Sequence, residues 1–396
     1  MNGPASGGAD RPLRFFLVAG EESGDQLGAA LMRALKRRVG VPLSFTGVGG
    51  DAMASEGLAS LFPLRELTVM GIVAVVARLP ALLRRIRETA DTALRTQPDA
   101  LIIIDSPDFT HRVARRVRAA APGIPIVDYV SPSVWAWRPG RARAMRAYVD
   151  HVMALLPFEP AAHVRLGGPP CTYVGHPLTG RVHELRPNAD EARRRAEDPP
   201  LLLLLPGSRR SEVRRLLPAF AGAVERLVAR SGAPKLVLPT VPHLADEIAA
   251  ATRTWLHRPR ITVDPGEKCA AMRTARAALA ASGTVTLELA LAGVPMVGAY
   301  RLAAAEAMIA RRVIRVPSVI LANLVLGENV VPELLQGDCT PDRLAAALAP
   351  LFGDTAERRR QTEAIERLDG IMQNGSAEPD ERAADIVLAL ARAGRA

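Results

Sequence analysis

The sequence predicts an α/β fold with two doubly wound domains, each built on a parallel sheet. Continuous apolar runs, such as the five leucines at 201–205, alternate with segments of helical periodicity, which is typical of strands covered by helices on both faces. The alternation occurs twice, before and after a polar stretch at 181–200 that we interpret as a linker. A chain of 396 residues is long enough for two domains that each bury a core.

The composition is that of a globular protein with a strongly basic charge balance. Hydrophobic residues make up 48% of the chain and charged residues 23%, which excludes a disordered or fibrous protein. The net charge of +10 favours an anionic partner: nucleic acid, an anionic membrane surface or a phosphorylated substrate. Aromatic residues make up only 4%, which argues against a stacking surface for single-stranded nucleic acid, and we expect no nucleic-acid partner.

The cysteines and apolar runs bear on compartment and membrane insertion. Cys171, Cys269 and Cys339 lie far apart, so we expect a reducing compartment, no disulfide framework and no metal or other cofactor. The N-terminus lacks the basic and apolar regions of a signal peptide. Arg78 and Glu288 interrupt the two longest apolar runs before either reaches the roughly 18 to 20 residues that span a bilayer. The sequence therefore predicts a protein that can lie on a membrane but does not cross it.

The first strand, at 14–19, leads into a glycine-containing loop at 20–25 and then into a helix at 26–38. The loop after the first strand is a common ligand site in α/β folds. It does not match the G-x-G-x-x-G fingerprint, so a dinucleotide cofactor is not indicated. Ser23 and Gly24 are candidate ligand contacts, and helix capping is the alternative interpretation of both residues.

A basic amphipathic segment occupies residues 69–86. Arginines lie on its polar faces, and its apolar residues recur with helical spacing: Ile72, Val75, Val76, Leu79, Leu82, Leu83 and Ile86. Pro80 is expected to kink or divide this helix. With Val69 and Met70 exposed at its start, the segment suits an interfacial membrane contact or a passage for acyl chains. The alternative is a helix that packs on the sheet with its arginines in solvent.

Two carboxylates follow a buried strand at 100–104, in the sequence Asp105-Ser106-Pro107-Asp108. The carboxyl end of a central parallel strand is where such folds place their chemistry, so either aspartate is a candidate general base. Asp108 has the alternative role of capping the next helix. Strands at 125–130 and 151–155 flank a loop whose two tryptophans, Trp135 and Trp137, either line a pocket or pack against the sheet.

The leucine strand at 201–205 is followed by a sharp turn at Pro206 and Gly207 and a helix at 209–230. Ser208 occupies the expected N-cap position. The helix N-terminus and the guanidinium of Arg209 would then face the end of the strand, an arrangement that suits a phosphate or diphosphate. An ordinary strand-to-helix turn with solvated arginines is the alternative.

The second half continues with strands at 235–239, 260–263, 277–280 and 295–298, separated by helical segments. The turn at 281–284 is a second strand-to-helix junction suited to a phosphate. Glu288 follows in its helix and is able to accept the hydroxyls of a ribose. A polar-tipped loop at 322–329 and helices from 340 onward complete the chain.

Together these motifs resemble the lipid-A-disaccharide synthase family along nearly the whole chain. The segments that carry the resemblance are AGEESGD (19–25), VMGIVAV (69–75), DSPDF (105–109), YVSPSVWAWR (129–138), PFE (157–159), LPGSRRSEV (205–213), ASGTVTLELAL (281–291) and ANLVLGENVVPELLQ (322–336). The resemblance implies a GT-B fold, in which two Rossmann-like domains face each other across an inter-domain cleft. It implies an N-terminal domain of residues 1–183, joined by a C-terminal helix at 376–396, and a UDP-sugar-binding domain of residues 184–375.

The implied reaction is an inverting glycosyl transfer in lipid A and lipopolysaccharide biosynthesis. The donor would be UDP-2,3-diacylglucosamine and the acceptor 2,3-diacylglucosamine 1-phosphate (lipid X), joined by a β-1,6 bond with release of UDP. Asp105 matches the family's proposed general base, with Asp108 as the competing candidate. Helix N-termini and Arg209 would stabilise the leaving UDP without a metal. The donor contacts implied are Glu21, Ser23, Gly24, Gly207, Ser208, Arg209, Ser282, Gly283, Thr284, Glu288 and Asn323.

The resemblance also assigns the 69–86 segment to a membrane-facing region, because both sugars carry acyl chains. The acyl or membrane contacts would be Val69, Met70, Ile72, Val75, Val76 and Leu79. We therefore expect a cytoplasmic protein bound peripherally to the inner face of the inner membrane through anionic lipid. Glu328 departs from the family pattern, since some relatives carry an arginine there. The last helix would either return to the first domain or exchange with a partner chain in a homodimer.

Two other functions stay open on the sequence alone. Another UDP-sugar transferase or epimerase of the same fold would be indifferent to acyl chains, and the amphipathic 69–86 segment counts against it. A non-catalytic basic protein would bind polyanions with a steep salt dependence and no turnover, which would leave Asp105 without a purpose.

Overall fold

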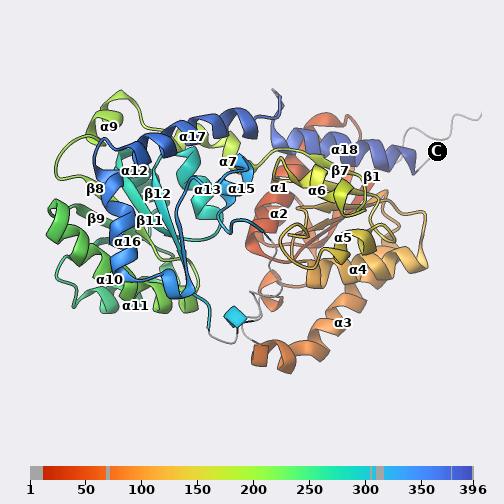
Figure 1. Cartoon of the computed structure of the whole chain (residues 1–396). Coiled ribbons are helices and arrows are strands. Elements are labelled where there is room, and N and C mark those ends of the chain that lie inside the picture. Colours follow the sequence, from red (N-terminus) through yellow and green to blue (C-terminus); the bar gives the residue numbers. More distant parts are fainter. Residues whose placement is uncertain (1–11, 68–71, 304–305, 309–315, 376, 395–396) are drawn as a thin grey trace, which may run out of the picture. The chain divides into compact units, whose positions relative to one another are not determined.

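The computed structural model describes residues 12–67, 72–303, 306–308, 316–375 and 377–394, with only the backbone described at 72–78. The chain forms two compact units (Figure 1). Unit 1 runs from the N-terminus to Pro177 and resumes at Asn374, and unit 2 comprises Leu178–Gln373. The sequence-based boundaries, 183/184 and 375/376, lie a few residues later along the chain.

In the described part of unit 1, seven strands form one sheet in the order β3-β2-β1-β4-β5-β6-β7, with parallel pairing throughout. The strands are β1 (Leu13–Ala19), β2 (Leu43–Val48), β3 (Ala59–Ser60), β4 (Ala100–Ile104), β5 (Ile126–Tyr129), β6 (His151–Ala154) and β7 (Cys171–Tyr173). The chain moves outward from β1 to β3 and returns to β4 on the other side of β1. The strand order therefore reverses between β1 and β4, and we call their carboxyl ends the switch point of unit 1.

Helices cover both faces of this sheet. Alternate side chains of the central strands enter two cores, with Phe15 and Ile102 on one face and Phe16 and Ile103 on the other. The first face is covered by α1 (Glu22–Arg38), α2 (Asp51–Ser55) and α18 (Pro379–Ala393), and the second by α3 (Ile72–Thr96), α4 (Pro107–Ala120) and α5 (Gly140–Met145). The remaining short elements are a 3₁₀ turn (Leu64–Glu66), α6 (Glu159–Arg165) and α7 (Pro177–Gly180), which lies at the unit boundary.

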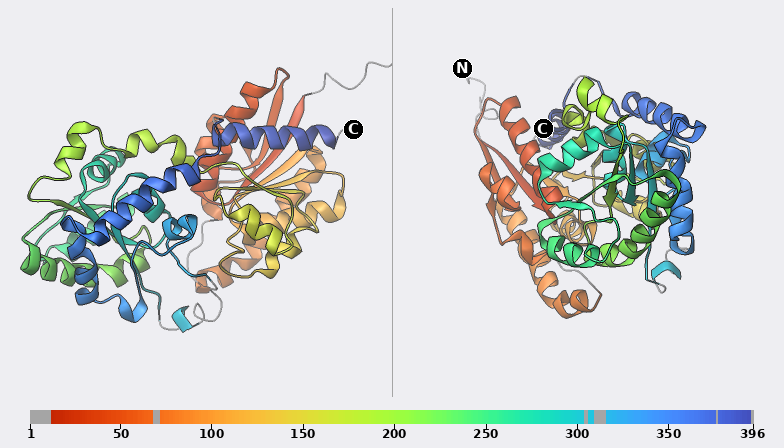
Figure 2. Two further views of the ribbon diagram at one scale, coloured as in Figure 1. Left: turned by 45° about the horizontal axis from the view of Figure 1, so that its top comes forward. Right: turned by 90° about the vertical axis from the view of Figure 1, so that its left-hand side faces the viewer.

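The C-terminal helix returns to unit 1, one of the two alternatives left open by the sequence. α18 packs along α1, where Arg37 donates to Asp380 at 3.1 Å and Arg38 lies 3.4 Å from Glu381. Figure 2 shows α18 beside the helices and sheet of unit 1. The last helix of the chain thus completes the core that the first helix begins.

In the described part of unit 2, six strands form a second sheet in the order β10-β9-β8-β11-β12-β13, again with parallel pairing. The strands are β8 (Leu201–Leu205), β9 (Lys235–Pro239), β10 (Arg260–Thr262), β11 (Ala277–Ala281), β12 (Met296–Tyr300) and β13 (Glu333–Leu335). The leucine strand β8 is central and almost wholly buried, as its composition predicted. The strand order reverses between β8 and β11, which gives unit 2 a switch point of its own.

The helices of unit 2 also lie on both sheet faces. One face carries α10 (Arg210–Ser231), α11 (Ala245–Thr252) and α16 (Pro341–Leu348), and the other carries α12 (Pro265–Thr274) and α13 (Thr284–Leu291). The remaining helices among the described residues of this unit are α8 (Val182–Leu185), α9 (Ala189–Arg194), α15 (Leu321–Leu326) and α17 (Ala356–Met372). Three 3₁₀ turns lie at Pro242–Leu244, Gln336–Asp338 and Ala349–Phe352.

The interpretation of residues 181–200 as a linker is wrong, because this stretch folds onto unit 2. Its helices α8 and α9 pack against α12. The guanidinium of Arg195 donates to the carbonyls of Met272 and Arg273 at the end of α12 and to those of Ala292 and Gly293 after α13. A cation that satisfies the free carbonyls of two helix ends is stabilising there. From the sequence alone, Arg195 would be interpreted as a solvent-exposed arginine.

Two helix predictions also need correction. The first helix begins at Glu22 rather than at 26, so Glu22 and Asp25 lie in its first turn, where negative charge is favourable. Pro80 was expected to kink or divide its helix, and it lies within α3, a single helix from Ile72 to Thr96 that changes direction along its length (Figure 1), so the division does not occur. A proline removes only its own donor, and the other hydrogen bonds of the helix continue past it.

Candidate functional site

Two loops meet at the switch point of unit 1. Ala19 and Ile104 are paired at the ends of β1 and β4, so Gly20 and Asp105 follow on adjacent strands. Both Asp105 and Ser106 have left-handed backbones, with φ of +53° and +44°. Non-glycine residues adopt this conformation at a cost of roughly 1–3 kcal/mol each, and such strain is concentrated at functional sites.

Asp105 is anchored by its own backbone and faces α1 with its carboxylate. Its amide donates to Tyr129 O at 3.1 Å, its carbonyl accepts from Thr110 Oγ1 at 2.6 Å, and its Oδ1 accepts from the Ser106 amide at 2.7 Å. The Ser23 hydroxyl lies near this carboxylate and favours its charged form. The structure therefore brings together Ser23 and Asp105, two of the predicted site residues.

Burial raises the pKa of the Asp105 carboxyl above its ordinary value, and the nearby Asp128 adds to the rise. The Ser106 amide and the Ser23 hydroxyl oppose it. Asp108, the competing base, is in a different environment. Its side chain is 75% exposed and lies 3.3 Å from Arg141 and 4.0 Å from Arg138. A held, partly desolvated carboxylate is the better general base, so the geometry favours Asp105.

The other residues of the first loop support the site around Asp105. Gly24 packs against β4, since a Cβ there would lie 3.3 Å from Ile104 O. Asp25 is buried and accepts from the amides of Gly50, Ala52 and Met53 at 2.8–3.0 Å, which anchors the start of α2. Glu21 is the exposed N-cap residue of α1, and its side chain makes no capping bond. Ser23 lies in the first turn and is therefore not the cap.

The loop that contains Trp135 and Trp137 is held by contacts with residues 158 and 159. Trp135 Nε1 donates to Glu159 Oε1 at 3.1 Å, and its ring packs edge-on against Phe158 at 5.1 Å. Trp137 is 37% exposed, with the Arg138 guanidinium 4.4 Å from its ring centroid. Trp135 therefore has a packing role, the alternative that the sequence left open.

In unit 2, the loop after β8 is shaped by a buried glutamate that the sequence analysis did not single out. Gly207 has φ of +106°, and a Cβ on it would lie 2.4 Å from Glu212 Oε2. Glu212 accepts from the backbone amide of Arg209 at 3.4 Å, from its Nη1 at 3.2 Å and from Tyr300 Oη at 3.4 Å. Arg209, not Ser208, is the N-cap of α10, and its side chain is 62% exposed.

The loop after β11 lies at the same switch point, because Leu205 and Ala280 are paired. Gly283 is the N-cap residue of α13 with φ of +151°, and no atom lies within 4 Å of the position of a Cβ. The Ser282 hydroxyl donates to Val319 O at 2.7 Å, so it fixes the next loop. Thr284, the first residue of α13, is exposed. This junction is open in front of the helix N-terminus, as a phosphate site requires.

Glu288 and Asn323 have partners that the sequence did not reveal. Glu288 Oε2 lies 2.6 Å from Lys268 Nζ on α12. Asn323 is 1% exposed, and its Nδ2 donates to Val331 O at 2.9 Å and Glu333 Oε1 at 3.1 Å. Its Oδ1 accepts from the amides of Val330 and Val331. The prediction of a loop at 322–329 is wrong for its first part, because Asn323 lies in helix α15. Since its amide is fully used within unit 2, Asn323 can affect a ligand only by positioning the chain that follows this helix.

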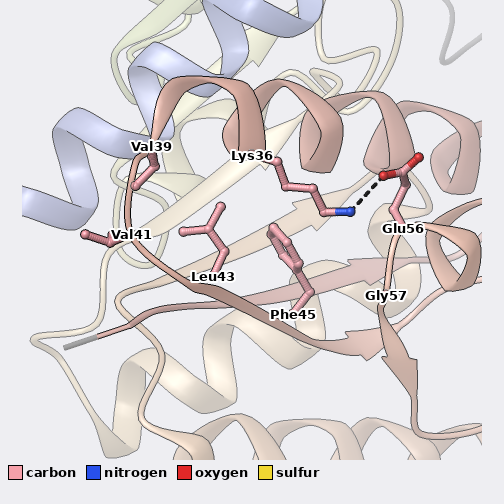
Figure 3. Close-up of a pocket in the computed structure, with 7 residues that line it drawn as sticks. All are labelled: Lys36, Val39, Val41, Leu43, Phe45, Glu56 and Gly57. Carbon is pink, nitrogen blue, oxygen red and sulfur yellow. Dashed lines mark hydrogen bonds and ion pairs between the residues drawn. The ribbon is translucent and has the colours of Figure 1, made fainter. Parts of the chain in front are cut away.

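A cavity of about 350 Å³ lies elsewhere in unit 1 (Figure 3). It is lined by Lys36, Val39, Val41, Leu43, Phe45, Glu56 and Gly57, with the Lys36–Glu56 ion pair of 2.9 Å at its rim. Its apolar floor includes the start of β2. The cavity therefore lies toward the amino ends of the strands, whereas Asp105 lies at their carboxyl ends. It contains none of the predicted site residues.

The predicted acyl contacts lie mostly beyond what the structure describes. Val69 and Met70 are outside the described residues, and Ile72, Val75 and Val76 belong to α3 without described side chains. Leu79 and Leu83 of the same helix are 40% and 38% exposed. No helix among the described residues is long and apolar enough to cross a membrane. In the same part of the chain, no group of three or more His, Cys, Asp or Glu is placed to hold a metal ion.

Two Rossmann-like units, each with loops gathered at a switch point, define a protein of the GT-B class, as predicted. Solved structures share this fold. A putative UDP-N-acetylglucosamine 2-epimerase from Listeria monocytogenes has a TM-score of 0.58 at 12% identity and covers 96% of this chain and 95% of its own. The glycotransferase of kitacinnamycin has a TM-score of 0.62 at 19% identity, with 96% and 99% covered.

Closer relatives identify the family. The family model described as lipid-A-disaccharide synthetase matches residues 15–387. The lipid-A-disaccharide synthases of Nitrobacter winogradskyi and Rhodopseudomonas palustris (strain HaA2) are 61% and 62% identical over 393 and 379 residues, which is 99% and 96% of each chain compared. The chain belongs to the lipid-A-disaccharide synthase family, a family of glycosyltransferases. The resemblance drawn from the sequence motifs is confirmed.

Proposed function

We propose that this protein forms the lipid A disaccharide 1-phosphate. It transfers 2,3-diacylglucosamine from UDP-2,3-diacylglucosamine to the 6-hydroxyl of lipid X, which creates a β-1,6 bond and releases UDP. Family membership supports the reaction class. The contacts at the two switch points support the roles of the individual residues.

The position of Asp105 is the observation on which the mechanism rests. An inverting transfer needs one base, because the acceptor hydroxyl displaces UDP at C1 in a single step. Asp105 removes the proton of this hydroxyl as the oxygen attacks. Its strained backbone, the Ser23 hydroxyl and partial burial hold the carboxylate in one place. A fixed base loses less entropy in the transition state than a mobile surface carboxylate such as Asp108.

The loops of unit 2 bind the UDP portion of the donor. Negative charge develops on the diphosphate as the bond to C1 breaks, and the N-termini of α10 and α13 together with Arg209 stabilise it. These two junctions are formed by the backbone of Gly207, Ser208, Ser282, Gly283 and Thr284. Glu288, held by Lys268, accepts the ribose hydroxyls, and Asn323 positions the adjoining loop. Glu21 and Gly24 contribute from the first loop of unit 1.

Acyl chains are bound through the N-terminal part of α3 and the residues before it. The exposed Leu79 and Leu83 support this assignment, with Val69, Met70, Ile72, Val75 and Val76 as further contacts. The basic residues of this protein attract anionic lipid. We accordingly place the protein in the cytoplasm, peripherally on the inner face of the inner membrane. A homodimer stays a prediction.

Acyl dependence of turnover tests the proposal. UDP release would be measured with UDP-2,3-diacylglucosamine and lipid X, and compared with the same two sugars lacking acyl chains. We expect release only when both acylated sugars are present. Release with unacylated sugars at the same rate would contradict the proposal.

A second candidate is a UDP-sugar epimerase, favoured by the shared fold of the Listeria protein. An epimerase would act on the donor without an acceptor. Conversion of the donor sugar in the absence of lipid X, followed by proton NMR, would select this function instead.

A further inference from the structure

A second aspartate is buried behind Asp105. Asp128 lies on β5, is 1% exposed and is paired in register with Ile103 of β4. Its sheet neighbours Val127 and Ile103 are aliphatic, and Tyr129 follows it on β5. A carboxylate removed from water in the middle of a parallel sheet costs free energy unless a partner compensates for it, so its presence requires a reason.

A chain of polar side chains leads from Asp128 toward the surface. Its Oδ2 lies 3.2 Å from His111 Nε2, but neither carboxylate oxygen of Asp128 has a hydrogen-bond partner among the described residues. His111 Nδ1 lies 3.0 Å from Tyr148 Oη. The Arg115 Nη2 donates to the same phenol oxygen at 3.3 Å, and its guanidinium stands 4.7 Å from the ring centroid. His111 and Arg115 belong to α4, the helix that begins two residues after Asp105.

The backbone links this chain to the base. The Asp105 amide donates to the carbonyl of Tyr129, the residue that follows Asp128 on β5. Asp105 is thus fixed to β5 by its amide and to α4 by the Thr110 hydroxyl, and Asp128 touches both elements. We propose that Asp128 is a positioning residue that acts through space on Asp105 during glycosyl transfer.

The electrostatic consequence follows from like charges. The negative charge of Asp128 adds to burial in raising the pKa of Asp105. A carboxylate with a raised pKa is a stronger base toward the acceptor hydroxyl. Asp128 and its partners interact electrostatically with other titratable or charged groups, which are His111 and Arg115 on α4, Arg141 on α5, Tyr148 after α5, Glu159 and His163 on α6, and Cys171 on β7.

Asp128→Asn tests the assignment through the pH profile of kcat/KM. The inference rests on the proposed function, in which Asp105 is the base. We expect the acid limb of the profile to move to lower pH and the plateau to fall, because the base becomes weaker. A folded variant with an unmoved acid limb would overturn the inference.

Asp99→Asn is the matched control. Asp99 is also buried, accepts from the Arg14 amide at 2.8 Å and lies at the opposite end of β4 from Asp105. We expect this change to lower stability and leave the acid limb in place. An equal shift in both variants would show a general effect of losing a buried charge and would also overturn the inference.

A double variant and a direct titration keep the test decisive. If Asp128→Asn does not fold, Asp128→Asn with His111→Gln replaces the pair by two amides that can bond each other, and the same shift is expected. Titration of the Asp105 carboxyl by ¹³C NMR, assigned by difference from Asp105→Asn, measures the coupling without turnover. A shifted titration in an inactive protein would mean that the proposed reaction fails while the coupling holds. An unshifted titration would refute the coupling itself.

Discussion

Gly20 and Ser106 lie in contact at the switch point of unit 1, so closely that no side chain fits on the glycine. A Cβ at residue 20 would lie 2.2 Å from Ser106 Cβ and 2.4 Å from its Oγ. Because Ser106 and Asp105 already have left-handed backbones, the loop has little freedom to retreat. The position of Asp105, the proposed base, is therefore set partly by the absence of a side chain on the neighbouring strand.

Gly20→Ala is expected to displace the Asp105 loop and to reduce kcat by at least tenfold, with a smaller effect on KM for the donor. Steady-state kinetics of UDP release measure this. Gly40→Ala is the matched control, since a Cβ there meets no atom within 4 Å. Equal activity of the two variants would show that the contact does not position the base.

Lys268→Met is expected to weaken UDP binding roughly fivefold, because Glu288 loses the cation that orients its carboxylate. Calorimetry with UDP alone measures the affinity. Lys268→Arg restores the charge and should recover part of it. Lys235→Met removes an exposed lysine at the start of β9 and should leave the affinity unchanged. If Lys268→Met binds UDP as the unaltered protein does, Lys268 has no part in the donor site.

Asn323→Ala is expected to lower the free energy of unfolding by about 2–3 kcal/mol, because the buried amides of Val330 and Val331 lose their acceptor. Chemical denaturation measures the change. Asn329→Ala, an exposed asparagine of the same loop, should cost much less. A small effect at both positions would mean that the loop finds other partners.

The raised pKa of Asp105 predicts opposite effects on activity and stability. Activity should fall as pH drops through the folded pKa, since the base is then protonated. Stability should fall as pH rises from the ordinary aspartate pKa to the folded pKa, because the native state binds the proton more tightly than the unfolded chain does. Asp105→Asn should therefore have a Tm at pH 7 at or above that of the unaltered protein, with the difference gone at pH 3. A lower Tm at pH 7 would contradict this assignment.

The fold was largely predictable because buried parallel strands have an unmistakable pattern. β4 and β9 match their predicted ranges to the residue, and the leucines of β8 form a central strand. The residues at 181–200 were misinterpreted because Arg195 satisfies helix-end carbonyls, a partner that no local pattern reveals. A polar residue is interpreted as solvent-exposed when its hydrogen-bond acceptors lie far away in the sequence.

The site was predictable only where a motif ends a strand. Asp105, Gly207 and Gly283 follow apolar runs within one or two residues, and the structure places them at the two switch points. Glu212, Lys268 and Asp128 were not singled out as site residues, since each also has a partner on another element. A glutamate three residues into a helix was the one local signal that pointed to Glu212.

The central claim is tested most directly by measuring UDP release with UDP-2,3-diacylglucosamine and lipid X. The measurement compares the unaltered protein with Asp105→Asn and Asp108→Asn. The account predicts turnover by the unaltered protein, a loss of several orders of magnitude in Asp105→Asn and near-normal turnover in Asp108→Asn. Turnover retained in Asp105→Asn and lost in Asp108→Asn would assign the base to the exposed carboxylate and contradict the account.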